Sequence, residues 1–112
     1  MSDLSREHCS PINATSLKLD ESQIDQLMKD VDGWKLLHKD NEARLEKTFQ
    51  FKDFNQALDF TNRIGQLANE EDHHPAILTE WGKVTVDWWT QKIKGLHRND
   101  FIMAAKTDEI SL

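Results

Sequence analysis

The segment EEDHHPAILTEWGKVTVDWW, residues 70–89, marks the point where the hydrophobic period of the chain changes. Before it, apolar residues recur at helical spacing, and after it they alternate with polar residues as in a strand. Pro75 disfavours continuation of a helix and biases His74 toward an extended backbone. The sequence therefore predicts a helix that ends and a strand that begins here, with two adjacent imidazoles at the junction.

The residues after Pro75 predict a β-hairpin. Residues 77–81 and 84–90 form its two strands, and Gly82-Lys83 is the expected turn. Alternation places three apolar side chains of the second strand on one face, namely Val84, Val86 and Trp88. An earlier hairpin is expected from residues 34–38 and 44–51, which flank the polar stretch KDNE.

Three helices are expected around these hairpins. Asp20 makes a good N-cap for the first helix, with Gln23 at the third helical position, and Gly33 supplies the stop. Asp53 can cap the second helix, which runs roughly to residue 70. Its expected buried stripe is Phe54, Ala57, Leu58, Thr61, Ile64 and Ala68. The third helix begins at about His97 or Asn99.

The resulting order, α-β-β-α-β-β-α, has no βαβ alternation. It favours an α+β fold with a four-stranded antiparallel sheet and helices packed on one face. We expect an irregular N-terminal segment over residues 1–19 and a single domain over residues 20–112, long enough for one modest core. The other sheet face would stay partly open, and the large tryptophan content suggests that a partner covers some of it.

Charge and composition narrow the classes of function. The net charge of −6 disfavours binding to nucleic acid or to an anionic membrane, because a phosphate-facing surface needs excess Lys and Arg. No apolar run approaches the roughly 20 residues that span a bilayer, and we expect a cytoplasmic protein. The single Cys9 allows no intrachain disulfide.

The histidine pair His73-His74 has three interpretations. Metal binding is awkward, because neighbouring side chains diverge and the common zinc spacings are absent, so no metal site is expected. One imidazole can instead cap the helix end while the other bonds locally. The third interpretation is acid–base chemistry, since an imidazole titrates near pH 6.5 and a pair can hold one donor and one acceptor. Spacing alone leaves these alternatives open.

Two further residue types also keep two interpretations each. Trp81, Trp88 and Trp89 are more often core or interface residues than platforms for a flat ligand. Asp100 can support the N-terminus of the last helix or anchor a nitrogen of a ligand, and spacing does not decide between these roles.

At these residues the chain resembles the bacterial type of the pterin-4a-carbinolamine dehydratase family. The likeness covers residues 20–110. Its most specific pieces are FKDFNQALDF at 51–60, HHP at 73–75, the aromatic Trp81, and GLHRNDFIMAA at 95–105. Their order and spacing match the family pattern.

The resemblance implies a hydro-lyase that removes water from 4a-hydroxytetrahydropterin to give quinonoid dihydropterin, recycling the cofactor of aromatic amino-acid hydroxylases. The pterin is then the substrate, and neither a cofactor nor a metal is expected. The resemblance also implies an α+β unit that forms a homodimer or homotetramer, functionally linked to such a hydroxylase.

The resemblance assigns the site residue by residue. His73 and His74 would be the acid–base pair. The expected substrate-binding residues are Pro75, Trp81, Gln91 and Asp100, and the expected supporting residues are Glu70 and His97. Two positions depart from the family: its usual acid falls on Asn69 and its usual third histidine on Gln91, which cannot shuttle a proton. The alternative function is therefore a pterin-binding or protein-interaction module that kept the fold and lost turnover.

Overall fold

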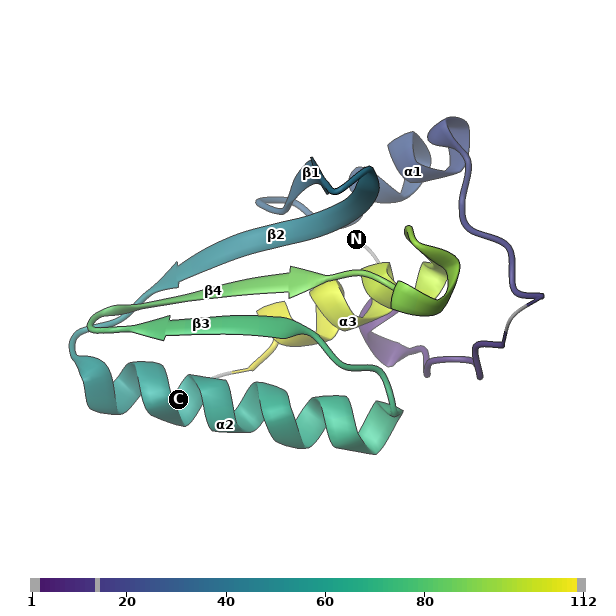
Figure 1. Cartoon of the computed structure of the whole chain (residues 1–112). Helices are drawn as coiled ribbons and strands as arrows, with labels where there is room; N and C mark the ends of the chain where they lie inside the picture. The colour runs from purple at the N-terminus through teal and green to yellow at the C-terminus, as the bar shows by residue number, and fades with distance from the viewer. Residues whose placement is uncertain (1–2, 14, 111–112) are drawn as a thin grey trace.

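The computed structural model describes residues 3–13 and 15–110, so residues 1, 2, 14, 111 and 112 of the predicted segments lie outside the described residues. Its elements follow the predicted order (Figure 1). The helices are α1 (Glu21–Met28), α2 (Phe54–Glu71) and α3 (Arg98–Asp108), with short 3-10 turns η1 (Leu4–Arg6) and η2 (Gln91–Ile93). The strands are β1 (Lys35–Lys39), β2 (Glu42–Gln50), β3 (Ala76–Glu80) and β4 (Lys83–Trp88).

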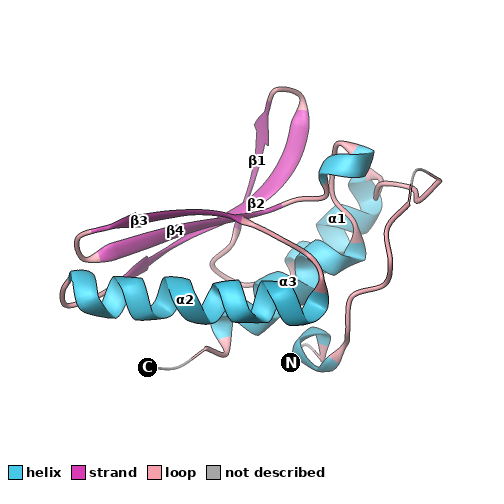
Figure 2. Ribbon diagram, turned by 60° about the horizontal axis from the view of Figure 1, so that its bottom comes forward, coloured by secondary structure: helices cyan, strands magenta, loops and turns pink. Residues whose placement is uncertain are grey.

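The four strands form one antiparallel sheet in the order β1-β2-β4-β3, and α2 and α3 lie across one face of it (Figure 2). This confirms the predicted α+β class. Alternation turns Val84, Val86 and Trp88 toward the helices, and all three are fully buried. They form the core together with Leu45 of β2 and apolar residues of both helices.

Both hairpins form, each with a two-residue turn. Asp40 and Asn41 join β1 to β2 with φ values of 54° and 64°, the left-handed backbone that favours Asn and Asp in such turns. The second turn is one residue earlier than predicted. It consists of Trp81 and Gly82, and Lys83 already pairs with Glu80 in the sheet.

The helix caps agree with the sequence, but two helical details differ. Asp20 and Gln23 form a reciprocal capping box at the start of α1. That helix ends at Met28, before the predicted stop at Gly33, because successive turns carry the chain on to Trp34.

The buried stripe of α2 is rotated from the predicted one. It consists of Ala57, Phe60, Ile64 and Ala68. Phe54 and Leu58, both predicted to be buried, are 42% and 41% exposed. Phe60 instead packs against Phe49 of β2 and Phe51, the residue after that strand ends, at ring distances of 4.7 and 4.9 Å, which fixes the face that α2 turns inward.

The described part of the N-terminal segment is largely irregular and packs on the rest of the chain. Leu4 is 3% exposed, and Nζ of Lys106 in α3 donates to the carbonyl of Ser5 at 2.8 Å. The guanidinium of Arg98 donates twice to Glu7, at 2.9 and 2.6 Å. Within the described residues, no helix is both long enough and apolar enough to cross a membrane.

Candidate active site

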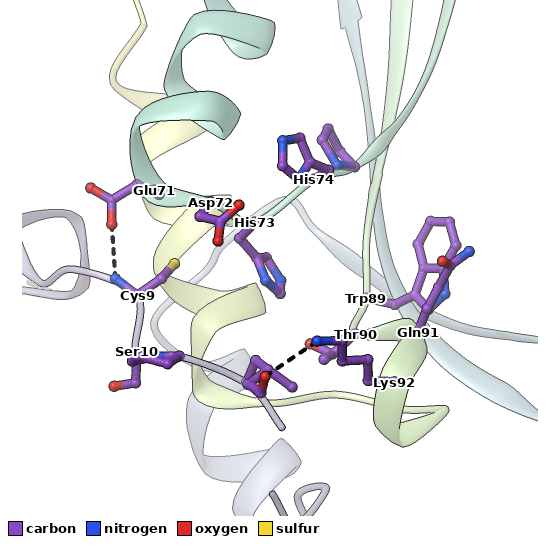
Figure 3. A pocket seen from close by; sticks show the side chains of 13 residues that line it. Cys9, Ser10, Glu71, Asp72, His73, His74, Trp89, Thr90, Gln91 and Lys92 are labelled. Carbon is purple, nitrogen blue, oxygen red and sulfur yellow. Dashed lines mark hydrogen bonds between the residues drawn. The ribbon is translucent and has the colours of Figure 1, made fainter. Parts of the chain in front are cut away.

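A pocket of about 560 Å³ opens at the end of the sheet where β3 begins and β4 ends. Three stretches of chain line it: residues 9–12 of the N-terminal segment, residues 71–75 after α2, and residues 89–92 after β4. Figure 3 shows the two histidines on one side and Trp89, Gln91 and Lys92 on the other. The pocket therefore brings together segments that are far apart in sequence.

The end of α2 sets the direction of the two histidines. Asp72 adopts a left-handed backbone (φ 51°, ψ 43°), which an aspartate tolerates, and terminates the helix. The backbone N–H of His73 then donates to the Ala68 carbonyl at 3.1 Å. Pro75 leads directly into β3. As a result His73 is directed inward, 7% exposed, while His74 is exposed at the pocket wall.

A buried carboxylate, that of Asp100, binds the imidazole of His73. Its Nε2 lies 2.6 Å from Oδ1 of Asp100, which is fully buried. A carboxylate only accepts, so Nε2 carries a proton and Nδ1 is the ring nitrogen left for a ligand. The ring also stacks on Trp88, with centroids 6.0 Å apart. Its orientation is thus fixed before any ligand arrives.

Asp100 is itself fully bonded. Its Oδ2 accepts from the Thr90 hydroxyl at 2.8 Å and from the His97 backbone N–H at 3.0 Å. It sits in the first turn of α3, where the helix dipole favours a negative charge. Asp100 does not line the pocket, so the structure shows its support of the helix start, and a contact of its carboxylate with a ligand nitrogen stays a prediction.

His74 has a weaker, exposed partner. Its Nε2 lies 3.1 Å from Oδ1 of Asn69, the residue that stands at the family's acidic position. Because the amide oxygen accepts, Nε2 donates and Nδ1 of His74 remains free to accept. Each imidazole therefore has Nε2 engaged by the protein, and its Nδ1 has no partner among the described residues.

Gln91 and Pro75, two of the residues predicted to bind the substrate, line the pocket. Trp89 also lines it, and the Arg44 guanidinium stacks on its ring at 3.6 Å from the centroid. The indole Nε1 of Trp89 is buried and has no hydrogen-bond partner among the described residues. This side of the pocket is therefore aromatic and polar at once.

Three other predicted site residues lie outside the pocket lining. Trp81 is 73% exposed in the β3–β4 turn, at the opposite end of that hairpin. Glu70 is exposed, and its neighbour Glu71 lines the pocket in its place. His97 caps α3, where its Nδ1 accepts from the Asn99 N–H at 3.0 Å, and burial lowers the pKa of His97.

Sequence reasoning missed the residues that approach from the N-terminal segment. Cys9 to Ile12 show no period, and only the tertiary contacts bring them to the pocket. Burial, followed by the nearby charges of Glu71 and Asp100, raises the pKa of Cys9 to about 12, so its thiol is protonated and a poor nucleophile. Among residues 3–13 and 15–110, no group of three or more His, Cys, Asp or Glu side chains is placed to hold a metal ion.

The fold and the site define a class: a small α+β protein whose pocket is lined by two adjacent imidazoles, each held through its Nε2. The chain belongs to the pterin 4 alpha carbinolamine dehydratase family, whose model matches residues 17–110. The matched range contains both histidines, Gln91 and Asp100. It begins after residues 9–12, which also line the pocket.

Relatives and solved structures agree with this assignment. A Marinobacter nauticus protein with the name pterin-4-alpha-carbinolamine dehydratase is 53% identical over 98% of this chain and 99% of its own length. A protein of the same name from Nitrosococcus oceani is 51% identical over 98% of this chain and 97% of its own.

A crystal structure of a transcriptional coactivator/pterin dehydratase from Brucella melitensis matches with a TM-score of 0.73 at 30% identity, over 81% of this chain and 95% of that one. A pterin dehydratase-like protein, identified as a RuBisCO assembly factor in the alpha-carboxysome, matches at TM-score 0.57 and 22% identity, over 68% of this chain and 86% of that one. The second likeness concerns the fold alone.

Proposed function

We propose that this chain is a pterin-4a-carbinolamine dehydratase, with His73 and His74 as its acid–base pair. One observation carries the proposal: two adjacent imidazoles reach one pocket, each with Nε2 held by the protein and Nδ1 left for a ligand. Family membership supplies the substrate class, a 4a-hydroxytetrahydropterin.

The chemistry fits two imidazoles. The C4a–O bond breaks as the hydroxyl leaves with an added proton, and the proton on N5 passes to a base. The electron pair of the N5–H bond forms the N5–C4a double bond, so water and quinonoid dihydropterin are the products. A protonated imidazole can supply the first proton and a neutral one can take the second near neutral pH. The other ring nitrogens stay bonded to Asp100 and Asn69.

The walls of the pocket suit a flat, polar heterocycle. Trp89 and Pro75 offer apolar surface, and the Gln91 amide can both donate to and accept from a pterin edge. Trp81, Glu70 and His97 stay predicted contributors, although they do not line the pocket of this chain. The proposal includes a homodimer or homotetramer in the cytoplasm and a functional link to an aromatic amino-acid hydroxylase.

Stopped-flow loss of chemically generated 4a-hydroxytetrahydropterin tests this function. We expect the wild-type chain to exceed the buffer rate, and His73→Ala and His74→Ala each to lower kcat by about 10²-fold or more. His38→Ala, an exposed histidine of β1, is the matched control and should leave the rate unchanged. A wild-type rate equal to that of buffer would exclude the dehydratase.

The second candidate, a pterin-binding module without turnover, is favoured by Gln91 and Asn69. Neither side chain can exchange a proton near neutral pH, and both stand at family positions that usually can. Gln91→His separates the two functions. A small change in kcat supports a two-histidine dehydratase, whereas turnover that appears only in Gln91→His supports the binding module.

A further inference from the structure

We propose that residues 9–12, here called the N-terminal strap, form a substrate-binding wall that lies outside the part of the chain matched by the family model. The family model begins at residue 17, yet Cys9, Ser10, Pro11 and Ile12 all line the pocket that holds both histidines. The inference rests on the proposed function, because it assigns the strap to the binding of that same substrate.

The strap is held in place by the same elements that carry the catalytic groups. The Cys9 N–H donates to Glu71 at 2.8 Å, two residues before His73. Burial alone would favour protonation of Glu71, but hydrogen bonds from Cys9 and His8 and the charge of Lys106 hold its pKa below the usual value. Glu71 is therefore a charged acceptor, and its bond to the strap is of the stronger, charge-assisted kind.

The side-chain amide of Asn99 binds the next residue of the strap, Ser10, through both its oxygen and its nitrogen. Its Oδ1 accepts from the Ser10 N–H at 2.9 Å and its Nδ2 donates to the Ser10 carbonyl at 2.8 Å. Asn99 is 1% exposed and adjoins Asp100, which orients His73. The strap and the catalytic imidazole are thus positioned by consecutive residues of α3.

These hydrogen bonds determine which groups of the strap remain available to a ligand. The Cys9 N–H and both backbone groups of Ser10 are bonded to the protein, and Pro11 has no N–H to donate. Nζ of Lys92, which also lines the pocket, lies 3.5 Å from the Ile12 carbonyl, so the strap contacts residues 89–92 there. Pro11 and Ile12, which carry apolar side chains, line the pocket beside Cys9 and Ser10.

An apolar wall opposite Trp89 and Gln91 is suited to contact with a heterocycle bound between them. Such a contact is made in the ground state and the transition state alike, so its loss should raise KM and leave kcat nearly unchanged. The two curated relatives align over 98% of the chain, so their alignments span the strap as well.

Ile12→Ala in the full-length chain tests the strap by steady-state kinetics. We expect KM for 4a-hydroxytetrahydropterin to rise about 3- to 10-fold, with kcat within about twofold, because a partly buried apolar contact is lost. Ile12→Val should restore most of the affinity. Leu17→Ala is the control. It removes an apolar side chain that is 85% exposed and lies in the N-terminal segment outside the pocket, so its KM and kcat should match those of wild type.

Equilibrium binding of 7,8-dihydropterin, followed by tryptophan fluorescence, keeps the two proposals separate. A weaker Kd in Ile12→Ala than in Leu17→Ala supports the strap even if the wild-type chain shows no turnover. Equal KM and Kd values in these two variants would overturn the proposed binding role of the strap. They would not contradict the proposed dehydratase function. Hydrogen exchange adds a third measurement: the amides of Cys9 and Ser10 should be protected in the free protein and more strongly with the pterin bound.

Discussion

Asp100 and Asp87 are both largely buried, on opposite faces of the sheet, and their surroundings differ. Asp100 lies on the helix-covered side with three donors at 2.6–3.0 Å. Asp87 lies on the other face, where its nearest cation, Arg44, is 3.7 Å away and its Oδ1 has no hydrogen-bond partner among the described residues. Burial, followed by the neighbouring Glu46, raises the pKa of Asp87 to about 6, although Arg44 opposes this shift.

The difference shows what a buried carboxylate needs. Where donors converge on it, as they do on Asp100, its oxygens are satisfied and it can orient the His73 ring. Where they do not, the group avoids the cost of a buried charge by keeping its proton to a higher pH. On the helix-covered side the carboxylate therefore fixes the direction of His73, whereas on the other side buried polar atoms next to the pocket wall at Trp89 have no hydrogen-bond partner among the described residues.

The largest effect should come from Asp100. Asp100→Ala leaves His73, Thr90 and the His97 N–H without their acceptor, so we expect a loss of about 3 kcal/mol in the free energy of unfolding and of about 10²-fold or more in kcat. Asp59→Ala, on the exposed face of α2, is the matched control. Urea unfolding and the stopped-flow assay give the two quantities.

Asp100→Asn sharpens this test because it keeps the shape of the side chain. Its amide oxygen can still accept from His73, but its amide nitrogen then faces the Thr90 and His97 donors. We expect better folding than in the alanine variant and a clear loss of kcat. Wild-type kcat in a folded Asp100→Asn protein would contradict an orienting role for the carboxylate.

A smaller effect is expected from Thr90→Val, which removes one of the three donors to Asp100. The variant has nearly the same shape and loses a single buried hydrogen bond, so the free energy of unfolding should fall by about 1–2 kcal/mol. The rate should fall by about 10-fold or less. Thr48→Val, which loses an exposed hydroxyl pair with Thr85, provides a control for the same change of side chain.

The smallest expected effect concerns Asp87, where a substitution should raise the free energy of unfolding and not lower it. In the unfolded chain Asp87 titrates near its ordinary pKa of about 3.9, so between that value and about 6 the folded chain binds more protons than the unfolded one. This contribution to stability is therefore lost as pH rises through that window. Asp87→Asn should raise the free energy of unfolding above pH 7 by about 0.5–1 kcal/mol, after solvent screening is allowed for.

Urea unfolding at pH 4.5 and pH 7.5 checks this sign. The gain from Asp87→Asn should be larger at pH 7.5 than at pH 4.5, and Glu46→Gln should reduce the same pH dependence by removing the like charge. An equal gain at both pH values would show that Asp87 does not titrate in the way its surroundings indicate.

Local patterns were sufficient for much of the fold. Asp20, Asp53 and the residues around His97 mark helix starts that the structure confirms. They succeed because a cap depends on groups within three residues of it. The predicted stripe of α2 was less accurate, since Phe54 and Leu58 also fit a helical period and only Phe60's packing against the sheet distinguishes the true inner face.

The site was predicted only in part. The HHP motif located both imidazoles, because Pro75 fixes a helix end and a strand start within one turn of chain. The partner of each ring was not deducible from spacing: Asp100 lies 27 residues from His73 and meets it only because α3 packs against the end of the sheet. Trp89, rather than Trp81, lines the pocket for a similar reason.

By itself, the sequence determined the order of elements, the helix caps, the two hairpins and the histidine pair at Pro75. Each of these follows from backbone preferences and hydrophobic period over a few neighbouring residues. Only the tertiary structure decided which carboxylate orients His73, which tryptophan faces the pocket, and that residues 9–12 form one of its walls. Those outcomes depend on contacts such as Cys9 with Glu71 and Ser10 with Asn99, which join positions 62 and 89 residues apart and leave no local pattern in the chain.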